Sequence, residues 1–124
     1  MLGEQTMMQG MDADKAALLE AGLAKIRERF IASLEDRIES FCTLLERLED
    51  PETEESACME IRAQAHKLHG ICGSVGQPRM GALAAQLEQH IDTLLAGERP
   101  LNTDFVDDLL NALLDEMEQN VDGA

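Results

Sequence analysis

The sequence predicts an all-α protein, an up-down antiparallel four-helix bundle with a short additional N-terminal helix or helix extension. Hydrophobic residues make up 44% of the 124 residues, yet Trp and Tyr are absent and Phe occurs only three times, so the core is aliphatic. Few of the apolar residues are β-branched, which favours helices. Apolar positions recur at steps of three and four, and no segment shows strand-like alternation.

The N-terminal third of the chain contains a tail and one long helical segment. Residues 1–12 are polar with scattered Met and Gly, and we expect a flexible tail there, followed by a bundle over residues 13–120. Between residues 14 and 49 a helical period is set by Leu19, Leu23, Ile26, Phe30, Ile38, Phe41, Leu45 and Leu48. Gly22 is a point at which this segment can divide, so one helix and two helices both remain open.

The next helix carries the most informative part of the sequence. Asp50-Pro51-Glu52 predicts its start, because Asp is a good N-cap and Pro fits the first helical position. We expect this helix to end near Ser74, before the breaking residues Gly76-Gln77-Pro78. Its apolar stripe consists of Cys58, Ile61, Ala65, Leu68 and Cys72.

Two further helices complete the bundle. Pro78 opens the first, which ends at Gly97 and has on one face Met80, Leu83, Leu87, Ile91 and Leu94. His90, near the end of this helix, is interpreted as a structural residue. Asn102 or Thr103 caps the last helix, whose apolar residues are Phe105, Val106, Leu109, Leu113 and Met117. The short connections predict antiparallel neighbours.

Charge and composition exclude several classes of function. The formal charge of −15 argues against binding to nucleic acid and to anionic membrane surfaces. No apolar run is long enough to span a bilayer, and residues 1–14 lack the basic and then apolar pattern of a signal peptide. Three cysteines without a paired motif predict a reducing compartment, so we expect a cytoplasmic protein. The Met start and the loose ends favour an independent protein.

His66 lies beside the apolar stripe of its helix and not on it. It follows Ala65 by one residue, which is about 100° around the helix. Arg62, His69 and Gly73 share this flank, and Gly70 follows one turn after His66. Because glycine weakens a helix, its repeated use here indicates that another molecule comes close to the imidazole. An exposed imidazole can act as a nucleophile or a base near neutral pH.

The hairpin geometry predicts a partner for His66. If the turn centres near Gln77, antiparallel residues at one level have numbers that sum to about 154, which pairs His66 with Glu88. Glu88 follows Leu87 by one residue, so it also lies beside its stripe. A carboxylate there could accept a hydrogen bond from one ring nitrogen and fix the tautomer. The alternative is that Glu88 is one more solvated acid.

A motif spans these positions: Ala65-His66-Lys67-Leu68-His69-Gly70, followed by Gly76 and Leu87-Glu88. It resembles the histidine phosphotransfer (HPt) domain of bacterial two-component phosphorelays, over about residues 30–92. The resemblance implies that His66 accepts the phosphoryl group, that Gly70 gives it room and that Glu88 orients the ring. It implies a phosphocarrier with no kinase or ATP-binding site and no cofactor of its own, whereas Mg²⁺ is expected on the partner receiver domain.

The chain departs from the family at one position. The family usually has a lysine three residues after the phosphoacceptor, where it steadies the phosphoryl oxygens, and this chain has His69. A protonated His69 could take that role, with help from Lys67 or Arg62. The partners implied are response-regulator receiver domains and a sensor or hybrid histidine kinase. We expect Arg62, Lys67, Gly70 and Gly73 to meet the acidic receiver pocket, and a monomer is favoured over a dimer.

Two other interpretations stay open. One is a non-catalytic helical module that binds a partner helix. The other is a metal site, because His66, His69 and Cys72 follow one another at steps of three and could share a side of the helix with Glu88. Against the metal site, Cys72 falls on the core stripe, as do Cys58 and approximately Cys42, and such cysteines are usually small buried hydrophobes.

Overall fold

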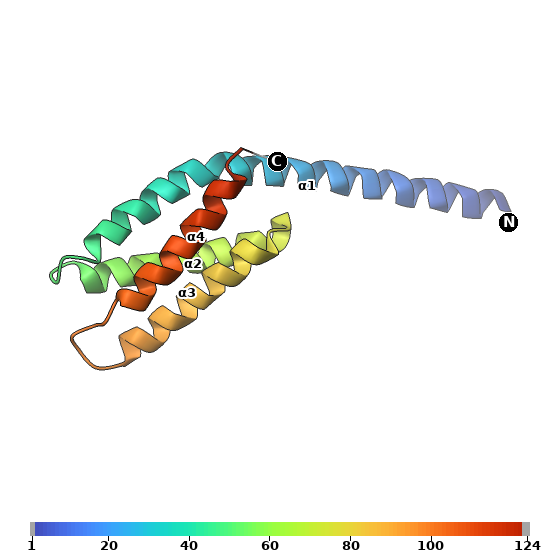
Figure 1. The fold of residues 1–124 in the computed structure, drawn as a ribbon. Helices are drawn as coiled ribbons and strands as arrows, with labels where there is room; N and C mark the ends of the chain where they lie inside the picture. Colours follow the sequence, from blue (N-terminus) through green and yellow to red (C-terminus); the bar gives the residue numbers. More distant parts are fainter. Residues whose placement is uncertain (1, 123–124) are drawn as a thin grey trace.

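A computed structural model describes residues 2–122, with side chains described from residue 13 onward. Its four helices are α1 (Leu2–Arg47), α2 (Glu54–Val75), α3 (Pro78–Ala96) and α4 (Asp104–Asn120). The second half of α1 packs on α2 and α4, and α3 packs on α2 and α4, so the four helices form an up-down bundle (Figure 1). The predicted all-α bundle is therefore confirmed. Within the described residues, no helix has the length and hydropathy needed to cross a membrane.

The N-terminal part of the chain is one continuous helix. Gly22 lies inside α1 without breaking it, because a single glycine costs only about 1 kcal/mol in a helix rich in Ala, Leu, Lys and Glu. The backbone of residues 2–12 is also helical, where the sequence predicts a tail. The first half of α1 projects away from the bundle (Figure 1), so the extra N-terminal element is an extension of the first helix. Leu19 and Ile26, expected in the core, are exposed.

The start of α2 differs from the prediction. The helix begins at Glu54, with Thr53 at the N-cap position, and not at Pro51. The Asp50 carboxylate accepts a hydrogen bond from the Glu52 backbone N–H (2.9 Å), and the Asp50 carbonyl accepts from the backbone N–H of Thr53 (3.0 Å). These bonds make residues 50–53 a turn that precedes the helix.

The remaining boundaries agree closely with the sequence. α2 ends at Val75, because Gly76 has a left-handed backbone (φ 73°) and the Gln77 N–H donates to the Cys72 carbonyl (3.1 Å). α3 begins at Pro78 and stops before Gly97. At the start of α4, Thr103 occupies the N-cap position, whereas the Asn102 side chain accepts the Asp104 N–H at 3.1 Å.

The buried core is apolar, and the whole predicted stripe of α2 belongs to it. Cys58 and Cys72 are buried there, but Cys42 is exposed and does not join them. Phe105, which the sequence also places on an apolar face, is 52% exposed. Its ring packs edge-on against the His90 ring, with centroids 4.7 Å apart. Both Cys42 and Phe105 lie one position away from the part of their helix that faces the core.

Candidate functional site

His66 lies on the outer face of α2, and its side chain is 69% exposed. The antiparallel α3 brings Glu88 to the same level, with His66 Nδ1 2.7 Å from Glu88 Oε1. An ionised carboxylate can only accept a hydrogen bond, so this contact assigns the proton of the neutral ring to Nδ1. The lone pair then lies on Nε2, and the ring is held in one orientation with this nitrogen free to react.

The close packing of α2 against α3 sets this register. A Cβ atom on Gly81 would lie 3.0 Å from the Cys72 Cβ, so the missing side chain lets the two helices approach. Arg62, one turn before His66, contacts Asp92, one turn after Glu88, in the same antiparallel register. The hydrogen bond from Arg62 and the negative charge of Asp92 raise the pKa of the guanidinium. The sequence predicts that Arg62 presents its positive charge to a partner, but in the structure Arg62 forms an ion pair with Asp92 of the same chain.

The glycines that follow His66 leave the outer face of α2 bare. Gly70 and Gly73 are exposed, and a Cβ atom at either position would meet nothing within 4 Å. The packing of the chain itself therefore does not require glycine at these positions. His69 is exposed on the same face. Because Gly70 and Gly73 have no side chain, a second molecule could approach the His66 ring closely.

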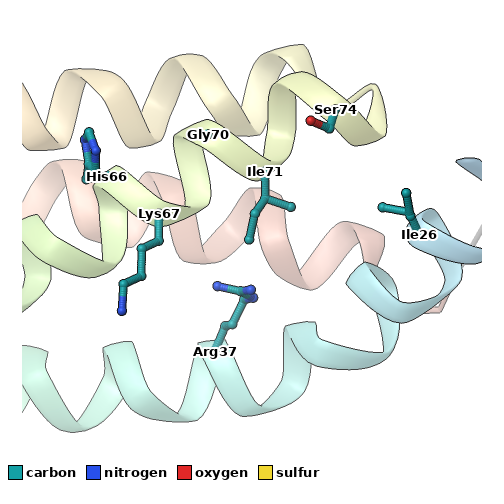
Figure 2. A pocket seen from close by; sticks show the side chains of 7 residues that line it. All are labelled: Ile26, Arg37, His66, Lys67, Gly70, Ile71 and Ser74. Atoms are coloured by element: carbon teal, nitrogen blue, oxygen red, sulfur yellow. The ribbon is translucent and has the colours of Figure 1, made fainter.

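A shallow hollow of about 580 Å³ borders His66 on the side of α1 (Figure 2). Its lining consists of Ile26, Arg37, His66, Lys67, Gly70, Ile71 and Ser74. Lys67 and Arg37 extend from α2 and α1 into the space between these helices, whereas His66 points away from α1 (Figure 2). The hollow therefore combines an apolar surface with two cations.

Arg37 is a residue of this hollow that the sequence does not predict. The α1–α2 contact places it near Lys67, and one marker of that contact is the hydrogen bond from Gln64 to Ser40 (2.9 Å). Arg37 donates to Ser33 Oγ (3.0 Å), which orients its guanidinium. No spacing within α1 singles out this arginine, because its position depends on how two separate helices pack.

The two buried cysteines do not join the site. Burial raises the pKa of Cys58 and of Cys72 to about 11, so both remain neutral thiols on the inner face. Cys72 therefore does not share a side of α2 with His66 and His69, as the metal interpretation requires. Among the described residues, no three His, Cys, Asp or Glu side chains come together as a group that could hold a metal ion.

The fold and the site define a class of protein, a helical bundle that presents one oriented, exposed imidazole to the surface of another molecule. The family model of the Hpt domain matches residues 25–120, which is more than half of the chain. The chain therefore belongs to the Hpt domain family, whose members carry phosphoryl groups on a histidine in two-component phosphorelays and have no kinase site. Searches of curated proteins and of solved structures found no match.

Proposed function

We propose that this chain is a phosphorelay carrier that accepts a phosphoryl group on Nε2 of His66. The donor is the aspartyl phosphate of a receiver domain or a histidine kinase, and the acceptor is the aspartate of another receiver. The observation that carries this proposal is the exposed His66 ring whose Nδ1 lies 2.7 Å from the Glu88 carboxylate. Family membership supports the same assignment.

In the proposed reaction the lone pair of His66 Nε2 attacks phosphorus in line with the departing aspartate oxygen. A P–N bond forms, the P–O bond breaks, and the electron pair of that bond returns to the aspartate carboxylate. The ring becomes positively charged, and the Nδ1–H donates to Glu88, whose negative charge stabilises that cation. The reverse transfer uses the same atoms. The receiver would supply Mg²⁺ and most of the charge stabilisation.

The surface around His66 suits such a partner. Lys67 and Arg37 place positive charge in the hollow that borders His66, and Gly70 and Gly73 leave room for a receiver to approach. Local cations matter here because an overall charge of −15 would repel an acidic receiver pocket. Arg62 contributes less, because Asp92 already neutralises it. The three free cysteines fit the reducing cytoplasm.

The proposal is tested by incubating the protein with a receiver that carries ³²P on its aspartate. We expect an acid-labile, base-stable label on the wild-type protein and none on His66→Gln. His90→Gln is the matched control, because it removes an imidazole that lies outside the proposed site and should keep the label. Label on His66→Gln, or no label on the wild type with a panel of receivers, would overturn the proposal.

His69 is proposed to steady the phosphoryl oxygens in its protonated form, in place of the usual lysine. An imidazole changes its charge near neutral pH and a lysine does not. We therefore expect the phosphohistidine lifetime of the wild type to change more between about pH 6 and pH 8 than that of His69→Lys. Parallel pH profiles of the two proteins, measured by loss of ³²P, would show that His69 does not contribute this charge.

A further inference from the structure

A second hollow, of about 410 Å³, lies between α3 and α4, and we call it the α3–α4 groove. Its lining consists of Gln86, Gln89, His90, Thr93, Phe105 and Leu109. The helices contact one another in the cyclic order α1, α2, α3, α4, so this groove and the hollow between α1 and α2 lie on opposite sides of the bundle (Figure 1). On α3, Glu88 contacts α2 whereas His90 contacts α4, so the groove is separate from the His66 site.

Phe105 provides an apolar anchor at one edge of the groove. Its side chain is 52% exposed, and its ring packs edge-on against the His90 ring with centroids 4.7 Å apart, a favourable geometry that holds Phe105 in one orientation. Leu109, one turn further along α4, is partly buried and continues the apolar surface. On the α3 side, the exposed amides of Gln86 and Gln89 can donate and accept hydrogen bonds but carry no charge. Exposed aromatic rings next to such polar groups are typical of protein interfaces.

The charge of α4 indicates which kind of partner fits the groove. α4 contains six Asp or Glu and no Lys or Arg, so it carries −6, whereas α2 and α3 carry −1 each. Three of these carboxylates are exposed and share the face of α4 next to Phe105, because they follow one another at steps of four and seven: Asp104, Asp108 and Asp115. None of the three forms an ion pair with a described residue. Positive charge from outside the chain could therefore pair with all three.

These carboxylates do little to stabilise α4 itself. Asp108 lies four residues after Asp104, and like charges at this spacing repel each other. Glu118 lies in the last turn, where the helix dipole disfavours negative charge and α4 has no basic residue to offset it. By contrast, Glu116 faces α3 and pairs with Arg79 at 3.2 Å. The acid at the helix contact is thus neutralised within the chain, whereas the acids beside the groove leave a repulsion that a cationic partner would relieve.

We propose that the α3–α4 groove is a docking site for a basic amphipathic helix of a partner protein. A helix laid in the groove places an apolar side chain against Phe105 and Leu109. Lys or Arg residues at steps of four and seven on that helix lie about 6 and about 10 Å apart, which matches the spacing of the three carboxylates. The negative charge of the groove attracts basic partners and repels acidic ones. Because the groove faces away from the hollow beside His66, its occupant leaves that surface open to a receiver.

An NMR titration of the ¹⁵N-labelled full-length protein tests the proposal. The probe is a synthetic peptide of Leu, Ala and Lys, designed as an amphipathic helix with Lys at steps of four and seven. A salt concentration of about 150 mM screens distant charges. We expect a Kd in the micromolar range and chemical-shift changes concentrated at the groove and on the adjoining face of α4. The proposal is overturned by changes spread evenly over all acidic surfaces, by changes concentrated around His66, or by no binding up to about 1 mM peptide.

Two variants and a matched control separate the apolar anchor from the charge. Phe105→Ala should weaken peptide binding about tenfold, because it removes the anchor. Asp108→Lys/Asp115→Lys should weaken it more than about tenfold, because it replaces attraction with repulsion. Asp36→Lys/Glu39→Lys changes the net charge equally at exposed residues of α1 and should weaken binding less than about twofold at this salt concentration. Circular dichroism checks that each variant keeps its helices. Equal weakening by the α1 control would assign the binding to overall charge and overturn the proposal.

The groove and the function proposed for His66 are tested separately. His66→Gln should bind the peptide with wild-type affinity, because His66 lies outside the groove. If His66→Gln weakened binding as much as Phe105→Ala does, the peptide would lie at the His66 surface and the groove proposal would fail. Asp108→Lys/Asp115→Lys should accept the phosphoryl group from a ³²P-labelled receiver at the wild-type rate. Failure of peptide binding therefore leaves the phosphotransfer proposal untouched, and the reverse also holds.

Discussion

The inner face of α2 is buried and its outer face is not, although most residues of the outer face directly follow a residue of the inner face in the sequence. The inner face is packed into the core, and none of its residues is more than 1% exposed: Cys58, Ile61, Ala65, Leu68 and Cys72. No residue of the outer face is buried: Arg62, His66, His69, Gly70 and Gly73. Stability and proposed chemistry are therefore carried by different residues of one helix. Substitutions on the two faces should have separable effects.

The largest difference is expected from a matched pair of truncations. Leu68→Ala removes a completely buried side chain and should lower the free energy of unfolding by about 3 kcal/mol. His66→Ala shortens an exposed side chain and should change it by less than about 0.5 kcal/mol. Urea unfolding followed by circular dichroism measures both. Comparable losses for the two variants would show that the faces are not energetically separate.

Alkaline pH should lower the free energy of unfolding through the two buried thiols on the inner face of α2. Burial raises the pKa of Cys58 and of Cys72 from 9.0 to about 11, so the folded state holds these protons more tightly than the unfolded state. The stabilisation is complete below pH 9 and is lost as the pH rises from 9 to about 11. At about pH 10 we expect a loss on the order of 1 kcal/mol for each thiol.

Unfolding titrations of the wild type and of a Cys58→Ala/Cys72→Ala variant check this pH dependence. The variant should be less stable at neutral pH, but its stability should fall less steeply above pH 9. Iodoacetamide provides a second readout, since it should alkylate the exposed Cys42 first in the folded protein. Equal slopes in the two proteins would assign the alkaline loss to other groups.

The register of the α2–α3 hairpin could be predicted from the sequence, whereas contacts between separate hairpins could not. Gly76 and Pro78 fix the turn, and an antiparallel pair with a short turn has only one register that buries both stripes. The level placement of His66 and Glu88 follows from this. Arg37 reaches the neighbourhood of His66 only through the packing of α1 on α2, which leaves no local pattern in the sequence.

Two misassignments along the helices have local causes. The turn at residues 50–53 combines a good N-cap residue with proline, and the same residues also favour a turn before the helix. The exposed stripe of α1 has the period of a core-facing helix, but a period does not say which molecule covers the stripe. In both cases the local preference predicted from the sequence is correct, but the arrangement of the helices in space decides which structure forms or which surface is covered.

Two contacts to the outer face of α2, those made by Glu88 and Asp92, can be compared directly. Both are carboxylates of α3 that contact a basic residue of α2, one at His66 and one at Arg62. Glu88→Ala should slow phosphotransfer about tenfold, the lower end of what is lost when the partner that orients a functional histidine is removed. Asp92→Ala should change the rate less than about twofold, because a surface ion pair contributes little.

Transfer rates from a ³²P-labelled receiver measure this comparison, with Glu88→Gln as the conservative variant. The glutamine can still accept the Nδ1–H through its amide oxygen but carries no charge, so its rate should lie between those of the wild type and Glu88→Ala. An equal slowing by Asp92→Ala and Glu88→Ala would mean that the α2–α3 contact as a whole matters, and not the orientation of His66.

The smallest change, Gly70→Ala, should move stability and transfer in opposite directions. A Cβ atom at Gly70 meets no other atom within 4 Å, so alanine should stabilise the helix by about 0.5–1 kcal/mol. The same methyl group projects into the space through which a receiver approaches His66, and it should slow transfer. Gly81→Ala is the contrasting control, because its Cβ would lie 3.0 Å from the Cys72 Cβ and should destabilise the bundle. If the Gly70→Ala variant accepts the phosphoryl group as fast as the wild type, close approach at this glycine is not part of docking, and the exposed glycines of α2 need another explanation.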